Sequence, residues 1–338
     1  MPKEITHVFF ADETNQKINT LNKDKLHQVI TENITSFHFG SLAVDTFYYS
    51  VKIPFIERNY FQWGDTVHGA EGNDTSLLVI SMLDELKKEK NTHLFPQKLA
   101  FVSGFLTHMA MDINFHPYVY YFSGNYYDED PSESANAQMR HRIIEGWIDL
   151  YMLDKNKTNL DKFMAIKNII KDKNINLKLL EFLGKSGSEI WNTDLQRMNK
   201  FLKKGYFVQF FLNSVFGNNA FKNFIKNLNS IFDNKLRGLL SLFYPNSVNN
   251  MPDFIVNFEM FKNPVTGQEF KGNLDDIWNN ALELSSDFLG SVNDYIFEDL
   301  SKEGLKDIIK GYSLDVGLIG VKVHEVKYFS PWQLTPSD

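Results

Sequence analysis

The feature that most constrains the fold of this chain is a polar stripe inside an apolar helical segment. Residues 97–116 carry apolar side chains at helical spacing, and His108, Asp112 and His116 stand four residues apart among them. On an α-helix, residues at i and i+4 lie one above the other on the same face. Burying three such side chains without partners is costly, so the stripe favours a row of metal ligands over a hydrogen-bonded polar cluster. Pro117 predicts that the helix ends near His116.

A second pair with the same spacing follows one loop later. His141 and Glu145 lie on a segment predicted to be helical from about residues 133–137 onward, with Ile143, Ile144 and Ile148 suited to a core face. A His–Glu pair at i and i+4 is one way in which a helix presents two zinc ligands. The pair is common in isolation, but its position directly after the first stripe strengthens the prediction of a metal site.

Three further candidates stand upstream. His7 and His68 are weak signals alone, and His68 is expected in a loop over residues 50–75. Asp45 lies in an otherwise apolar stretch and needs a partner, which a metal, a helix N-cap or a buried salt bridge can each supply. We predict that eight residues converge on a multinuclear zinc site: His7, Asp45, His68, His108, Asp112, His116, His141 and Glu145.

Composition restricts the chemistry of such a site. The chain has no cysteine, so disulfides and thiolate ligands are impossible and any metal is held by nitrogen and oxygen. Iron or manganese can use the same donors. The net charge of −7 argues against general binding of nucleic acid, whose affinity comes largely from Lys and Arg. A phosphodiester substrate is compatible with that charge, because bound metal ions supply positive charge locally.

The rest of the chain predicts more helices and no second domain. A polar helix is expected over 23–35, amphipathic helices over 75–90 and 274–297, and helices with polar faces over 156–185. A Phe-dense helical core is expected over 204–243, loops over 244–273 and an extended tail over 313–330. We therefore expect one all-α domain over residues 1–338, with a metal-ligand half (1–155) and a helical packing half (156–338).

The sequence contains no run of about 18 apolar residues, so no transmembrane helix is expected. The N-terminus lacks the apolar core of a secretory signal, so a cytoplasmic location is expected, or secretion if the N-terminus is truncated.

Five segments in this order resemble the bacterial zinc-dependent phospholipase C family. They are Thr6-His7, residues 39–45 (Phe-Gly-Ser-Leu-Ala-Val-Asp), His68-Gly69, residues 106–117 and residues 141–145 (His-Arg-Ile-Ile-Glu). The order and rough spacing of the ligands agree across residues 1–150. The segment 263–267 (Asn-Pro-Val-Thr-Gly) and the helix after it also look like the second half of the family.

The resemblance implies an all-α fold with a metal cleft and two or three Zn²⁺ ions. By the resemblance, one zinc is held by Asp45, His68, His108 and Asp112, a second by His116, His141 and Glu145, and a third by His7, with Asp112 bridging it to the first. It also implies that Asp45 is the general base. Secreted members complete the third site with an N-terminal Trp. This chain begins Met1-Pro2 with no Trp nearby, so the third site can be incomplete, water-filled or absent.

The resemblance further implies a zinc-dependent phosphodiester hydrolase, of the phospholipase C type that cleaves a phospholipid head group with zinc-activated water. Two alternatives stay open. One is a related phosphodiesterase of the nuclease type, and the other is a catalytically weakened zinc-binding helical protein with a binding or structural role. The expected partner is a phospholipid or another phosphodiester, and peripheral membrane contact through the Phe-rich half is left open.

Overall fold

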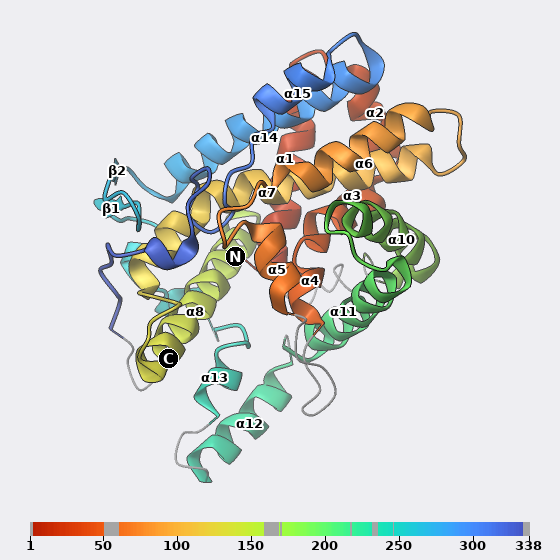
Figure 1. Cartoon of the computed structure of the whole chain (residues 1–338). Coiled ribbons are helices and arrows are strands. Elements are labelled where there is room, and N and C mark those ends of the chain that lie inside the picture. Colours follow the sequence, from red (N-terminus) through yellow and green to blue (C-terminus); the bar gives the residue numbers. More distant parts are fainter. Residues whose placement is uncertain are drawn as a thin grey trace.

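A computed structural model describes residues 3–50, 61–158, 169, 171–216, 218–231, 236–245 and 247–333. Within these residues the chain is predominantly helical, and its regular strands form one two-stranded antiparallel hairpin (Figure 1). The predicted all-α class is therefore confirmed. The helices are α1 (Glu4–Thr20), α2 (Asp24–Glu32), α3 (Ile34–Ala43), α4 (Thr46–Tyr49), α5 (Phe61–His68), α6 (Ser76–Lys88), α7 (Phe95–Ser123), α8 (Pro131–Lys155), α10 (Lys173–Ile190), α11 (Leu195–Phe216), α12 (Asn219–Ile231), α13 (Arg237–Leu240), α14 (Leu274–Phe297) and α15 (Lys302–Ile308), and the hairpin is β1 (Met260–Lys262) with β2 (Glu269–Lys271).

Helix α7 runs through the middle of the molecule, with α6 and α14 beside it (Figure 1). It is buried on nearly all sides, which is typical of a helix at the centre of a large core. Helix α3 crosses it at close range, because both helices have glycine at the crossing. A Cβ added to Gly40 would lie 2.0 Å from the Phe101 carbonyl oxygen, and one added to Gly104 would lie 1.9 Å from the Phe37 carbonyl oxygen.

The predicted end of this helix near His116 is wrong, because α7 continues through Pro117 to Ser123. Proline inside a helix costs about 3 kcal/mol, since it removes one backbone hydrogen bond and crowds the carbonyl four residues earlier. Burial of the following turn offsets that cost. Tyr118 is fully buried, and its hydroxyl donates to the Ile255 carbonyl at 3.0 Å. Gly317, at φ +68°, leaves room for the Ile113 carbonyl that Pro117 displaces.

Other sequence predictions fare unequally. The helix predicted over 274–297 is α14, whose start is fixed by a capping box between Asn273 and Asp276. The loop predicted over 50–75 is partly wrong, because residues 61–68 form α5; residues 51–60, with Pro54, lie outside the described residues. Much of the helical segment predicted over 156–185 also lies outside them, and α10 covers its end. The tail over 313–330 is mostly irregular, with isolated bridges and a short 3-10 turn.

The prediction that the Phe-dense segment belongs to the core is wrong for the described side chains of α11 and α12. Five of them are exposed: Phe207, Phe210, Phe211, Phe221 and Phe224. Helix α11 packs on the body through Leu202 and Tyr206, which are buried. Phe232 and the side chain of Phe216 lie outside the description. Among the described residues, no helix is long and apolar enough to cross a membrane.

Candidate metal centre

The eight predicted ligands are buried and come from five places in the fold. His7 lies on α1, Asp45 between α3 and α4, His68 at the end of α5, His108, Asp112 and His116 on α7, and His141 and Glu145 on α8. The structure gathers them into three groups with ligand atoms within 4.8 Å of one another: His7, His108 and Asp112; Asp45, His68 and His108; and His116, His141 and Glu145. The structure therefore brings ligand atoms from distant segments of the chain close to those that the i,i+4 spacing aligns on α7 and α8.

Asp112 connects the first two groups. Its Oδ1 lies 3.5 Å from Nε2 of His7, while its Oδ2 lies 2.9 Å from Nε2 of His108 and 3.8 Å from Nε2 of His68. The carboxylate is fully buried. The rings of His7 and His108 stack in parallel with centroids 3.9 Å apart. One buried carboxylate thus faces three imidazoles that come from three different helices.

The role of Asp45, left open by the sequence, is narrowed by the structure. Asp45 occupies the N-cap position of α4, but its side chain makes no capping hydrogen bond there. Its Oδ1 instead lies 3.6 Å from Nε2 of His68 and 3.7 Å from Nε2 of His108. The N-cap alternative is therefore contradicted, and the carboxylate belongs to the imidazole cluster.

The third group is held together on the neighbouring faces of α7 and α8. Nε2 of His141 lies 2.7 Å from Oε1 of Glu145, and the rings of His116 and His141 are 5.6 Å apart. Tyr120 and Tyr126 pack edge-on against His141 at 5.2 and 5.5 Å. Tyr120 lies in α7 and Tyr126 in the loop that follows it, so both the helix and this loop contribute to the lining.

Backbone carbonyls orient three of the imidazoles. Nδ1 of His68 donates to the Gly64 carbonyl at 3.0 Å, and Nδ1 of His108 donates to the Ser41 carbonyl at 2.7 Å. Nδ1 of His116 donates to the Leu314 carbonyl at 2.7 Å. A carbonyl only accepts, so Nδ1 carries the proton and Nε2 is left with a lone pair. Such an outer hydrogen bond is the usual way in which proteins fix the tautomer of a metal-binding histidine.

The protonation of the cluster follows from burial and charge. Burial holds the pKa of His7, His116 and His141 well below its usual range, so these rings are neutral. At His68 burial also lowers the pKa, but the carboxylates of Asp45, Asp315 and Asp112 outweigh it and raise the pKa to about 9. The carboxylates around the His68 ring therefore strongly favour positive charge at this position.

The residues fit a bound metal. Both ring nitrogens of His7, both carboxylate oxygens of Asp112 and Nε2 of His116 are buried without a hydrogen-bond partner among the described residues. The 2.9 Å approach of His108 to Asp112 lacks the alignment of a hydrogen bond. Each buried polar group left in this way costs about 1–3 kcal/mol. Imidazole lone pairs facing carboxylates call for a cation between them, and nitrogen with oxygen donors is the set that zinc accepts.

Sequence reasoning missed one acidic residue of this centre. Asp315 is 4% exposed, and its Oδ1 lies 3.6 Å from Nδ1 of His116. Burial raises the pKa of Asp315 to about 6. Its neighbour Leu314 donates its amide to the His68 carbonyl at 2.8 Å while accepting from His116. The signal was available, because Asp315 is a lone carboxylate between Leu314 and Val316, the same pattern that singled out Asp45.

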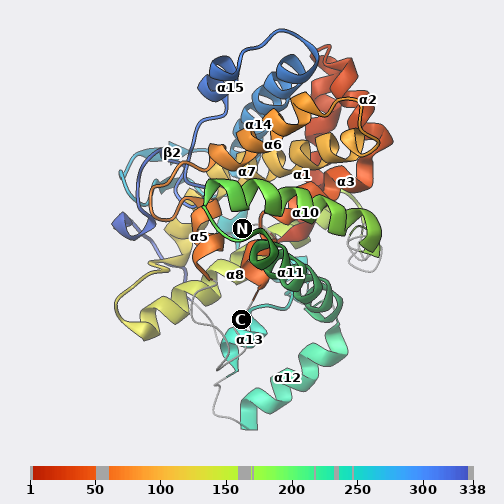
Figure 2. The same ribbon diagram turned by 45° about the vertical axis from the view of Figure 1, so that its right-hand side comes forward.

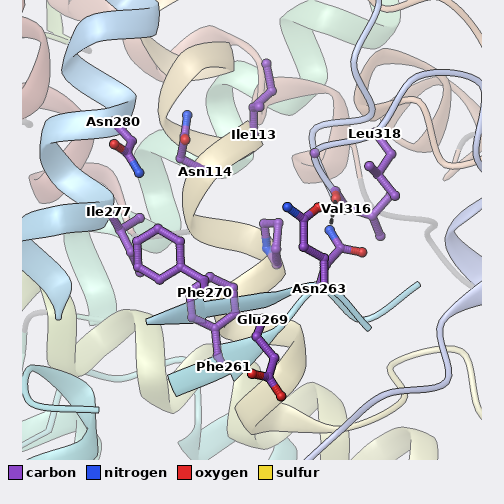
Figure 3. Close-up of a pocket in the computed structure, with 13 residues that line it drawn as sticks. Ile113, Asn114, Phe261, Asn263, Glu269, Phe270, Ile277, Asn280, Val316 and Leu318 are labelled. Carbon is purple, nitrogen blue, oxygen red and sulfur yellow. Dashed lines mark hydrogen bonds between the residues drawn. The ribbon is translucent and has the colours of Figure 1, made fainter. Parts of the chain in front are cut away.

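A cavity of about 240 Å³ lies beside α7, and Figure 3 shows its lining. Ile113, Asn114 and Pro117 come from α7, Phe261 and Phe270 from the hairpin, and Val316 and Leu318 from the segment that follows Asp315. None of the eight predicted ligands lines it. The cavity is therefore separate from the metal centre, although the segment that supplies Asp315 contributes to both.

The fold and this centre define a helical protein with buried groups of histidine and carboxylate residues that could hold metal ions. The sequence model of the family described as zinc dependent phospholipase C matches residues 6–190, more than half of the chain. The chain therefore belongs to the zinc-dependent phospholipase C family. The matched region contains all eight predicted ligands, whereas Asp315 lies outside it. No curated protein and no solved structure matches the chain.

Replacing Asp315 with asparagine is expected to weaken metal binding at the group of His116, His141 and Glu145. The carboxylate faces the protonated side of the His116 ring, and outer partners of this kind change metal affinity by about 10- to 100-fold. Competition against a chromophoric chelator measures the effect. Asp307→Asn, at an exposed position, is the control. Equal affinity in the Asp315 variant and the wild type would contradict a supporting role for Asp315.

Proposed function

We propose that this protein is a zinc-dependent phosphodiester hydrolase of the phospholipase C type, which cleaves the head group from a phospholipid. The observation that carries the proposal is the convergence of His7, His68 and His108 on one buried carboxylate, Asp112, in a member of this family. Asp45 lies against two of the same imidazoles, those of His68 and His108. By that arrangement Asp45, His68, His108 and Asp112 would hold one ion, and His116, His141 and Glu145 a second.

A third ion has the weakest support from side chains. Within the described residues its group consists of His7 with Asp112 and His108, and the latter two are shared with the first ion. We therefore propose two firmly held zinc ions and a third that dissociates first. Elemental analysis of protein purified without chelator or column metal tests this count.

The chemistry of the reaction divides between the metal and the chain. Bound zinc lowers the pKa of water toward about 7 and offsets negative charge on phosphoryl oxygens. Two carboxylates are proposed to hold the first ion. Asp112 is fully buried, while the Asp45 side chain is 10% exposed. Asp45 is thus the carboxylate that solvent reaches, and we assign to its Oδ atoms the acceptance of a proton from the attacking water. His68 and His108 hold Asp45 in place.

Asp45→Asn is the variant that separates catalysis from metal binding. The amide keeps an oxygen donor but cannot accept the proton, so turnover is expected to fall about 10²- to 10⁴-fold while most of the zinc is retained. Hydrolysis of phosphatidylcholine and of bis(p-nitrophenyl) phosphate measures turnover. Asp65→Asn is a matched control, because Asp65 is a partly buried carboxylate beside Tyr48 that belongs to no ligand group. A zinc-loaded wild type that cleaves no diester would instead favour a zinc-stabilised binding protein.

A further inference from the structure

Helices α11 and α12 present a cluster of aromatic side chains to solvent. We call it the Phe face, and its members are Phe207, Phe210, Phe211, Phe221 and Phe224. Phe211 exposes 63% of its surface and Phe224 exposes 55%. Single exposed apolar residues are ordinary, whereas a cluster of them marks a contact surface.

On each of the two helices the exposed Phe side chains lie close to one another along one side. On α11 the three Phe residues follow i, i+3, i+4 spacing and share one side of the helix. The opposite side is buried, and there Thr46, which follows Asp45, donates to Gln209 at 2.8 Å. On α12, the rings of Phe221 and Phe224 lie 6.3 Å apart. Both views show α12 projecting from the body of the molecule (Figures 1 and 2).

The charge of this region is opposite to that of the whole protein. Residues 195–231 contain six basic and no acidic residues, in a chain whose net charge is −7. The basic residues are Arg197, Lys200, Lys203, Lys204, Lys222 and Lys226. Helical spacing places Lys200 and Lys204 on the same side of α11 as Phe207 and Phe211. Lys203 forms an ion pair with Glu181 at 2.9 Å, so it contributes less to the positive electrostatic potential of this region.

We infer that the Phe face docks on the surface of an anionic phospholipid bilayer. Aromatic side chains at the boundary of head groups and acyl chains, flanked by lysines near lipid phosphates, are the pattern of interfacial helices. A second copy of this chain is a poorer partner, because two basic faces repel one another. The inference rests on the proposed function, since the bilayer matters here as the place where the phospholipid substrate lies.

Vesicle flotation tests the inference. Wild-type protein is expected to float with phosphatidylcholine vesicles that contain phosphatidylglycerol, more than with pure phosphatidylcholine, and to be released as salt is raised. Phe211→Ser combined with Phe224→Ser is expected to lower the bound fraction about tenfold or more, because the two rings that would enter the bilayer are lost. Lys200→Glu with Lys204→Glu is expected to abolish the preference for the anionic vesicles. Ile319→Ser removes an equally exposed apolar residue outside the Phe face and should leave binding unchanged.

Three results would overturn the inference. In the first, the wild-type protein does not float with the vesicles. In the second, the Phe variant and the Ile319 variant float equally well. In the third, sedimentation velocity shows that the wild type is a dimer and the Phe variant a monomer. Hydrolysis of the soluble diester, measured on the same proteins, keeps the two proposals apart. Turnover of the soluble diester without vesicle binding would contradict the docking proposal and support the proposed hydrolase. Vesicle binding without turnover of any diester would contradict the proposed hydrolase and support the docking proposal.

Discussion

Asp112→Ala is expected to remove zinc from the protein and to abolish hydrolysis. Its carboxylate faces the imidazoles of His7, His68 and His108, so it connects the group of His7, His108 and Asp112 with that of Asp45, His68 and His108. Without it, the buried rings of His7, His68 and His108 lose their shared anionic partner. We expect the zinc content to fall by at least one ion per chain. Turnover should drop about 10³-fold, since metal-ion catalysis supplies several kcal/mol and each 1.36 kcal/mol is tenfold.

Elemental analysis and diester hydrolysis on the same preparation measure this effect. His108→Ala should reproduce it, because His108 lies against Asp112 and belongs to both groups that Asp112 connects. His93→Ala is the matched control, since His93 is an exposed histidine just before α7. Its zinc content and turnover should equal those of the wild type. Unchanged zinc in both the Asp112 and His108 variants would show that the cluster is a polar core without metal.

Gly104→Ala is expected to cause the largest loss of stability of any single methyl group added to this protein. The new Cβ would lie 1.9 Å from the Phe37 carbonyl oxygen and 2.8 Å from the Ser41 amide nitrogen, which are backbone atoms that cannot rotate away. Helices α3 and α7 would have to separate. Overpacking of this kind costs about 3 kcal/mol, more than the roughly 1 kcal/mol that alanine gains over glycine in helix propensity.

Urea unfolding of the metal-free proteins measures this difference without any contribution from zinc binding. The Ser41 carbonyl, which accepts from His108, lies at the same crossing, so the variant should also bind zinc more weakly. Gly238→Ala is the control, because no atom lies within 4 Å of its added Cβ. A Gly104 variant as stable as the Gly238 variant would mean that the two helices are less tightly packed than described.

The sequence predicted the parts of this centre that depend on local periodicity. Spacing of four residues on a helix places His108 above Asp112, and His141 above Glu145, whatever the rest of the fold does. It also predicted the two amphipathic helices α6 and α14, whose apolar stripes are regular. Convergence of the two ligand helices with His7 was predicted from the residue types alone, because the pairing of distant segments leaves no periodic signal. The assignment of these ligands to individual ions came from the family resemblance.

The failures have tertiary causes. Pro117 does not end α7, because burial of Tyr118 outweighs the local penalty of proline. The Phe residues of α11 and α12 have helical spacing, but spacing does not reveal whether a core lies opposite them. Asp315 reaches His116 from nearly 200 residues away, a contact that no local pattern encodes. The single-domain organisation and the roles of the eight ligands stay predictions.

The contacts of Leu314 have a consequence for the order in which the protein is made. Leu314 touches His68 through its amide and His116 through its carbonyl, and 198 residues separate it from His116. At about 5–20 residues per second, a ribosome needs about 10–40 s to make that stretch. For most of this interval all eight predicted ligands have been synthesised, yet the His116 imidazole lacks the carbonyl that orients it. The centre therefore takes its final form only after the segment that carries Leu314 has been made.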